Sequence, residues 1–291
     1  MSRPAAGPAP TPRWVAAEAL PAALCNVSHP PAGLWVLGDV DSLRGAPDRH
    51  VAIVGTREAT PYGMRVATEL ATACARAGLV VVSGLARGID AVAHRAALDA
   101  GGETVAVQGT GVDVPYPVSH RALHALLANR ATVISEVELG TTAFRGCFPR
   151  RNRLIAALSK IVVVVEAGHK SGAINTATHA LELNGTVAAV PGRVDVPQSA
   201  GSNQLIFDGA QMIRSPADLL TLFGVPDAPA AMSRGPDGRR PAGPEPGELG
   251  ELGEMGGLGD LGELEGEGFA EFARRMLDAD LARSIQNYQS Y

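Results

Sequence analysis

The sequence predicts an α/β fold, in which a doubly wound, mostly parallel, Rossmann-like sheet is followed by a flexible acidic C-terminal tail. Three observations lead to this prediction. Short apolar runs alternate with segments of helical periodicity, the connections between them are short, and nearly every run ends in a glycine-containing loop. The run Val51–Val54, apolar throughout and closed by Gly55, is typical of a parallel strand buried on both faces.

Each element of this fold is predicted from its own pattern. Pro61 in a first turn, apolar residues at helical spacing and Gly78 at the end predict a helix after the strand at 51–54. Apolar runs predict strands at 34–37, 51–54, 79–82, 104–107, 132–134, 161–165 and 187–190. Further helices are expected at 14–24, 120–129, 148–160, 203–208 and 217–223, and in two segments that end at Ala100 and Asn184.

The composition divides the chain into a body and a tail. After Pro226 the sequence contains 13 acidic and 6 basic residues, so the tail has a net charge of −7 and the rest of the chain, at +2, is mildly basic. Glycine in nearly every triplet of Glu248–Gly262 disfavours a stable helix or strand there. We therefore expect an N-terminal extension (1–45), a Rossmann-like domain (46–225), a disordered linker rich in proline, glycine and glutamate (226–268), and an amphipathic helix (269–291).

Several classes of protein are disfavoured. No apolar run approaches the length of a transmembrane helix, and the N-terminus lacks the apolar region of a secretory signal. The three cysteines, Cys25, Cys74 and Cys147, have neither metal nor disulfide spacing, which favours a cytoplasmic location and no metal site. The sequence Gly109-Thr-Gly111 lacks the third glycine and the acidic partner of a dinucleotide fingerprint. We therefore expect no cofactor.

Basic and glycine-rich loops follow the predicted strands. In a doubly wound sheet, ligands bind at the carboxyl ends of the strands, where glycines and helix N-termini offer backbone N–H groups to anions. These loops are 55–57, 83–88, 109–113, 168–172 and 191–193. Three arginines, Arg150, Arg151 and Arg153, open one of the helices. We expect Arg150 and Arg153 to share a helix face and bind phosphate, and Arg151 to pair structurally with Glu136 or Glu166.

The body of the chain, from Pro31 to Leu220, resembles the DprA/Smf family of DNA-processing proteins. The resemblance lies in the joint order and spacing of Val51–Arg57, Ser83–Asp90, Ala93-His94, Tyr116-Pro117, Ser135-Glu136, Phe148–Arg153, Ser171-Gly172, Val190–Gly192 and Gly201–Asn203. It implies a bacterial, cytoplasmic homodimer that binds single-stranded DNA, shields incoming DNA during natural transformation and passes it to a RecA-type recombinase. The family is not known for catalysis, so the resemblance implies no catalytic residue.

The resemblance also implies which residues bind DNA. They are the basic and glycine-rich positions that match the family's loops, with Phe148 or Phe144 as a face on which a base stacks. The resulting set is Gly55, Thr56, Arg57, Ser83, Gly84, Arg87, Gly88, Phe148, Arg150, Arg153, Lys170, Ser171 and Gly172. The chain departs from the family pattern at Gln108, where an apolar residue is usual, and at Ala173, where a hydroxyl is lost. We also expect the family's N-terminal helical domain to be short or missing and the acidic tail to replace its C-terminal winged-helix module.

An alternative is a nucleotide-binding sensor or a nucleoside-monophosphate-cleaving enzyme on a related Rossmann-like fold. Such enzymes usually carry a Pro-Gly-Gly-x-Gly-Thr loop, whereas Pro191-Gly-Arg193 lacks the second glycine. Glu136 and Glu166 end strands and could serve as general acid or base, but no nucleophile or metal set accompanies them. Asp90 and His94, four residues apart on one helix, are expected to form a structural hydrogen-bonded pair. The sequence thus favours a binding protein over an enzyme.

Overall fold

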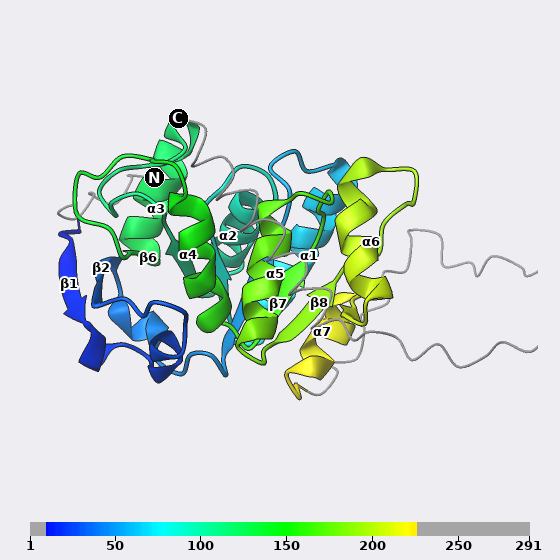
Figure 1. Ribbon diagram of the computed structural model, residues 1–291, viewed down its shortest axis with the longest axis horizontal. Coiled ribbons are helices and arrows are strands. Elements are labelled where there is room, and N and C mark those ends of the chain that lie inside the picture. Colours follow the sequence, from blue (N-terminus) through cyan, green and yellow to red (C-terminus); the bar gives the residue numbers. More distant parts are fainter. Residues whose placement is uncertain (1–9, 226–291) are drawn as a thin grey trace, which may run out of the picture. The chain divides into compact units, whose positions relative to one another are not determined.

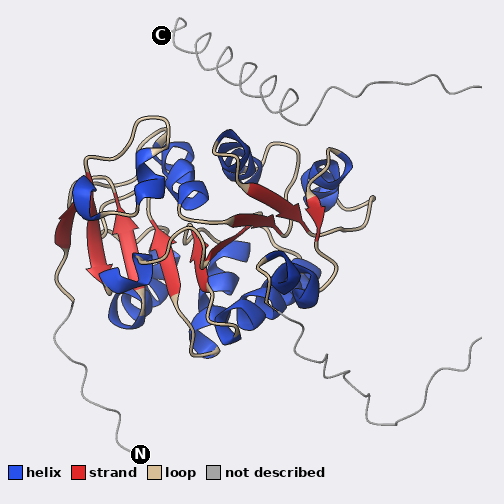
Figure 2. Cartoon of the chain, turned by 90° about the horizontal axis from the view of Figure 1, so that it is seen from below, coloured by secondary structure: helices blue, strands red, loops and turns tan. Residues whose placement is uncertain are grey.

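The structure, a computed structural model, describes residues 10–225, which form a nine-stranded sheet with helices on both faces (Figure 1, Figure 2). The strands are β1 (Arg13–Ala16), β2 (Gly33–Gly38), β3 (His50–Val54), β4 (Val80–Ser83), β5 (Thr104–Val107), β6 (Thr132–Ser135), β7 (Ile161–Val164), β8 (Thr186–Ala189) and β9 (Gln211–Met212). Their order is β1-β2-β6-β5-β4-β3-β7-β8-β9, and every neighbouring pair from β6 to β9 is parallel. The predicted doubly wound, mostly parallel sheet is confirmed.

Helices lie on both faces of this sheet, as Figure 2 shows. They are α1 (Pro61–Arg76), α2 (Ile89–Asp99), α3 (Arg121–Arg130), α4 (Cys147–Ala157), α5 (Gly172–Glu182), α6 (Ala200–Phe207) and α7 (Pro216–Leu222). Helix α1 packs against α2 and α7, and α4 packs against α5. Within residues 10–225, no helix combines the length and the hydropathy that a membrane span requires.

The core explains why the central strands are continuous apolar runs. Alternate residues of β3 and β7, among them Ile53 and Val163, pack with Leu70 of α1 and Ile89 of α2 in one buried cluster. The intervening residues of the same two strands are buried as well. Burial on both faces requires apolar residues at every position, and this is the pattern from which the strands were predicted.

The N-terminal segment differs from the prediction. Residues 14–24 do not form an α-helix, because Arg13–Ala16 form β1 and short 3₁₀ turns follow. Strand β1 pairs antiparallel with β2, and the rings of Trp14 and Trp35, which lie opposite one another, are 5.4 Å apart in an edge-to-face arrangement. The segment expected as an extension therefore adds two strands to the sheet, since cross-strand pairing outweighs the local helix preference of its alanines.

The other predicted strands are confirmed to within one residue at each end. Strand β9 is not predicted, because a strand of two residues has no periodicity that can be read from the sequence. The linker expected at 226–268 and the helix expected at 269–291 lie outside the described residues.

The order of the strands produces a switch point at the carboxyl edge of the sheet, between β3 and β7. The chain leaves β3 for β4 on one side, whereas β7 pairs with β3 on the other side. The connections that follow β3 and β7 therefore diverge at the carboxyl edge of the sheet. Ligands of doubly wound sheets bind at such a switch point.

Candidate functional site

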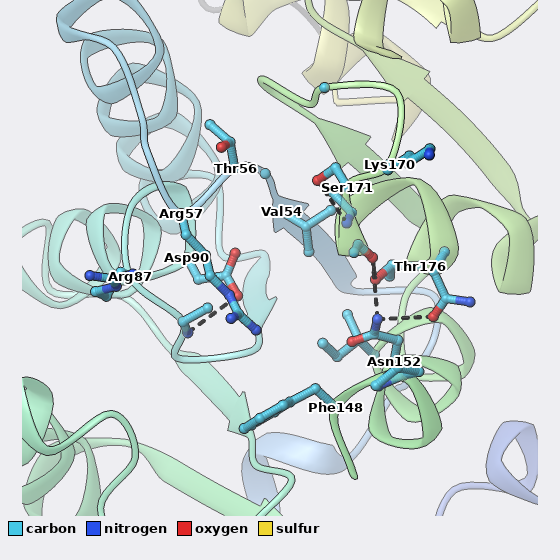
Figure 3. Close-up of a pocket in the computed structure, with 18 of the residues that line it drawn as sticks. Val54, Thr56, Arg57, Arg87, Asp90, Phe148, Asn152, Lys170, Ser171 and Thr176 are labelled. Carbon is cyan, nitrogen blue, oxygen red and sulfur yellow. Dashed lines mark hydrogen bonds between the residues drawn. The ribbon is translucent and has the colours of Figure 1, made fainter. Parts of the chain in front are cut away.

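A crevice of about 650 Å³ lies at the switch point between β3 and β7 (Figure 3). It is bounded by the loops that follow β3, β4 and β7 and by the first turns of α4. The predicted site residues that line it are Gly55, Thr56, Arg57, Arg87, Phe148, Lys170, Ser171 and Gly172. The fold thus gathers at one place side chains that are far apart in the sequence.

Three cations approach the crevice from three loops. Arg57 follows β3, Arg87 follows β4 and Lys170 follows β7, and all three residues are exposed. Figure 3 shows Arg57 and Lys170 on opposite sides of the crevice. Positive charges around a bounded cleft raise the local potential and attract an anion. The N-terminus of α5, which Ser171 caps, adds the partial positive charge of the helix dipole.

An aromatic face lies beside these cations. The guanidinium of Arg57 is 5.5 Å from the centre of the Phe148 ring, within the range of a cation–π interaction. Phe148 also packs against Tyr116, with ring centroids 4.9 Å apart. A second pocket of about 200 Å³ lies next to these rings and shares Arg57, Arg87 and Phe148 with the crevice. Phe144 is exposed but lines neither pocket, so Phe148 is the better candidate for a stacking face.

The arginines of α4 have different environments. The Arg150 side chain is 59% exposed and lies 3.2 Å from a carboxylate oxygen of Glu136. The Arg153 side chain is only 6% exposed and pairs with the same carboxylate at 2.7 Å. Its guanidinium also donates to the carbonyl oxygens of Ser28 and His29, at 3.0 and 2.8 Å. The donors of Arg153 hold the N-terminal segment against α4, and Arg153 does not line the crevice, so the structure gives no support to its predicted phosphate role.

Arg151 has the structural role that the sequence predicts, but with other partners. It is buried and donates to the carbonyl oxygens of Gly84 and Val107, not to Glu136 or Glu166. Burial lowers the pKa of Arg151 to about 10, so it remains charged at neutral pH. Burial also raises the pKa of Asp90, and the nearby Arg151 charge opposes that rise. Asp90 accepts from the N–H of Gly84 at 3.1 Å, so the two buried side chains bind both backbone groups of one residue.

Other predicted residues shape the loops and do not face the ligand. Ser83 is fully buried, and its hydroxyl donates to the Ile53 carbonyl at 2.7 Å, so its predicted binding role is not supported. Gly88 has a φ of +76°, and a Cβ there would lie 2.2 Å from the Thr56 carbonyl oxygen. Glycine at this position lets the loop after β4 pack directly on the loop after β3. Gly84 lines only the smaller pocket.

Two asparagines of the crevice, Asn152 and Asn175, were not predicted as site residues. Asn152 donates to the Gly172 carbonyl at 3.2 Å and to the Asn175 side chain at 3.0 Å, which joins α4 to the start of α5. Both asparagines line the crevice. Asn152 lies between Arg151 and Arg153 in the block Phe148–Arg153. The prediction selected charged residues of this block and omitted the uncharged asparagine between them.

Two carboxyl groups near the crevice, those of Glu166 and Asp90, have structural partners. Glu166 accepts from the backbone N–H of Thr60 at 2.9 Å and from the hydroxyl of the same residue. The expected pair of Asp90 and His94 does not form, because the His94 Nδ1 bonds to the Thr104 hydroxyl at 2.7 Å. Among residues 10–225, no three His, Cys, Asp or Glu side chains are grouped to hold a metal. The described site therefore offers a ligand three exposed cations, an aromatic face and one exposed carboxylate, that of Glu58.

His94 gives the fold a pH dependence that can be measured. The Thr104 hydroxyl donates to the Val81 carbonyl, so it accepts from His94 Nδ1–H. The other ring nitrogen, Nε2, is buried and has no partner among the described residues, which suits the neutral ring. Burial lowers the pKa of His94 to about 3, and the positive charges of Arg151 and His120 add to this effect. In the unfolded chain the pKa returns to about 6.5, so stability is complete above pH 6.5 and falls as the pH drops toward 3. We expect a loss of about 2 kcal/mol at pH 5.

Urea unfolding at pH 7.5 and pH 5.0 checks this expectation. The His94→Gln variant keeps a donor for Thr104 but cannot titrate, so its stability should change less between the two pH values. His29→Gln, at an exposed histidine, is the matched control and should behave like the parent protein. An equal loss of stability in His94→Gln and in the parent protein would contradict the assignment.

The chain is similar to known proteins. The family described as DNA recombination-mediator protein A matches residues 13–224. A DNA processing protein DprA of Mycobacterium tuberculosis is 46% identical over 196 residues, which are 67% of this chain and 50% of the relative. The chain therefore spans about half the length of this curated relative.

Two solved structures are similar as well. The X-ray structure of DNA processing protein A (DprA) from Streptococcus pneumoniae is 36% identical, has a TM-score of 0.68, and the match covers 72% of this chain and 73% of that one. The second is DNA processing protein A from Helicobacter pylori, whose structure was reported for its unique single-stranded DNA binding mode. It is 31% identical with a TM-score of 0.67, and the match covers 72% of this chain and 94% of that one.

Proposed function

The chain belongs to the DNA recombination-mediator protein A family, and from this premise we propose that it binds single-stranded DNA in the crevice between β3 and β7. The observation that carries the proposal is the convergence of Arg57, Arg87 and Lys170 around a crevice that the ring of Phe148 also lines. Cations that follow the phosphates and an aromatic ring that stacks on a base are the two means by which proteins hold single strands. In a duplex the base faces are stacked on one another, so Phe148 would favour a single strand.

We place this binding in the processing of DNA during natural transformation, where the protein protects incoming single strands and hands them to a RecA-type recombinase. The role is that of a binding protein without catalysis, in keeping with a crevice whose buried carboxylate, Asp90, is held by the backbone N–H of Gly84. A cytoplasmic location is supported by the three cysteines, all of which are free thiols.

The test of this function is direct. Labelled oligonucleotides of one sequence, single-stranded and duplex, are titrated with the full chain. Preferential binding of the single strand is expected, and equal affinity for the two forms would contradict the proposal. Release of a free base from nucleoside monophosphates would instead support the cleaving enzyme.

Binding should depend on salt, because it rests on phosphate contacts. If the three exposed cations each neutralise one phosphate, log K falls against log salt concentration with a slope of about −2. This corresponds to a loss of about 20-fold between 50 and 200 mM salt. Lys170→Gln should reduce the slope by about 0.7, because one contact is removed. A slope near zero, measured by fluorescence anisotropy, would exclude the backbone-following site.

We also propose that the protein is a homodimer that uses the β9 edge of the sheet. Strand β9 is an edge strand, and the large apolar side chains of Phe207 at the end of α6 and Met212 in β9 are 86% and 48% exposed. Exposed apolar side chains beside an open strand edge are typical of an interface. Phe207→Glu is expected to shift the protein toward monomer in sedimentation velocity. Val118→Glu, at an apolar side chain that is 69% exposed elsewhere, should leave the oligomeric state unchanged.

A further inference from the structure

The crevice contains an acidic side chain that the proposed phosphate contacts do not use. Glu58 follows Arg57 in the connection after β3, is exposed, and lines the crevice together with the three cations. Among residues 10–225 its carboxylate takes part in no salt bridge. The other carboxyl group that lines the crevice, that of Asp90, is buried and accepts from the N–H of Gly84. Glu58 therefore supplies the carboxylate that a ligand can reach.

The charge of Glu58 is unfavourable for phosphate. Like charges repel, so this carboxylate weakens the attraction that the neighbouring cations exert on the backbone of a strand. An ionised carboxylate offers only acceptors, so a group that binds it must donate a hydrogen bond. Ionised phosphates have no donor, whereas the edges of unstacked bases do. A strand in the crevice therefore gains binding energy from Glu58 through a base edge.

The aromatic face of the crevice lies beside the loop that carries Glu58. The residue before it, Arg57, has its guanidinium 5.5 Å from the centre of the Phe148 ring, and all three residues line the crevice (Figure 3). A base that stacks on an aromatic ring uses its face, so its hydrogen-bonding edge remains free for a neighbouring side chain. Phe148 can thus hold a base while Glu58 binds its edge.

The four bases differ in what they offer to a carboxylate. Guanine has two neighbouring nitrogen donors, its ring N–H and its amino group, which match the two oxygens of a carboxylate. Adenine and cytosine have an amino group beside a ring nitrogen that accepts, and thymine has one N–H between two carbonyl oxygens. In these three bases an acceptor faces the second carboxylate oxygen and repels it. Only guanine forms the bidentate, charge-assisted pair.

We propose that Glu58 is a specificity-determining residue that accepts from the ring N–H and the amino group of guanine, so that the crevice prefers single strands that contain guanine. The proposal rests on the proposed function and deepens it. The carboxylate acts in two ways, because it binds guanine and also lowers the affinity of strands that offer it no matching pair of donors.

The test uses thymidine oligomers about ten nucleotides long, in which separated thymines are replaced by guanine or by hypoxanthine. Hypoxanthine is guanine without the amino group, so it keeps the ring N–H and loses one of the two donors. The full-length parent protein should bind the guanine oligomer about tenfold more tightly than the hypoxanthine oligomer. EDTA is present throughout, so that no metal ion bridges the carboxylate to a phosphate.

Glu58→Gln removes the charge and one of the two acceptors. The ratio of the guanine and hypoxanthine affinities should fall to about two, while the affinity for the unmodified thymidine oligomer should rise about two- to threefold. A misfolded variant could not produce this gain. Glu138→Gln is the matched control, since Glu138 is exposed, lines neither pocket and has no salt bridge in the described part of the chain. It should keep the parent ratio.

The possible failures of this test can be told apart. Equal affinity of the parent protein for the guanine and hypoxanthine oligomers overturns the inference and leaves single-strand binding intact. A guanine preference that Glu58→Gln retains in full also overturns it, because another group must then bind the base edge. Failure of the parent protein to bind any of the oligomers overturns the proposed function itself.

Discussion

Arg153→Ala is expected to lower the free energy of unfolding by about 3–5 kcal/mol. The substitution leaves the carboxylate of Glu136, whose side chain is 7% exposed, without its buried partner. It also removes the donors that bind the carbonyl oxygens of Ser28 and His29. These carbonyls belong to the N-terminal segment, so that segment should loosen together with the ion pair.

Urea denaturation followed by circular dichroism measures this loss. Arg150→Ala is the matched control, since Arg150 lies on the same helix and contacts the same carboxylate but is mostly exposed. Exposed pairs contribute little, so the control should cost less than about 1 kcal/mol. Equal effects of the two substitutions would mean that burial of Arg153 does not determine its contribution.

Arg57→Glu is expected to weaken single-strand binding about 10- to 150-fold while the protein stays folded. A hydrogen bond to a charged group contributes about 1.5–3 kcal/mol, and the new carboxylate adds repulsion within the crevice. Arg57 is exposed and has no salt-bridge partner among the described residues, so little stability depends on it.

The control for Arg57 is another arginine over an aromatic ring. Arg65 lies 5.6 Å from the centre of the Tyr62 ring, close to the 5.5 Å between Arg57 and Phe148, but it lines neither pocket. Arg65→Glu changes the net charge by the same amount and should alter affinity less than about threefold. If both variants lose affinity equally, net charge and not the crevice would explain the binding.

Much of the fold could be predicted from the sequence because its signals are local. Strands such as β3 and β7 are buried on both faces and therefore appear as continuous apolar runs. Parallel order then brings the loops after them to one edge, so the convergence of Arg57 and Lys170 also follows from the sequence. The error at 14–24 has the opposite cause, since β1 exists only through its pairing with β2.

The environments of the arginines of α4 could not be predicted from the sequence. Their spacing correctly places Arg150 and Arg153 on one face, where both contact Glu136. Spacing cannot show that the N-terminal segment covers Arg153 and leaves Arg150 in solvent, because that contact joins residues more than a hundred positions apart. The same limit applies to Arg151, whose partners are carbonyls at the ends of β4 and β5. Carbonyl partners have no sequence signature.

The hydrogen bonds of Arg151 affect how fast a DNA strand binds in the crevice. Arg151 of α4 donates to the Gly84 carbonyl, and Asp90 accepts from the Gly84 N–H, so Gly84 is held through both of its backbone groups. The helix that carries Phe148 and the loop that carries Arg87 are thereby ordered when the protein folds. The binding of a strand therefore does not include the entropy cost of ordering them. Capture should then be governed by diffusion and electrostatic steering, with an association rate that falls as salt rises. Ligands that differ in affinity should therefore differ mainly in the dissociation rate of their complexes.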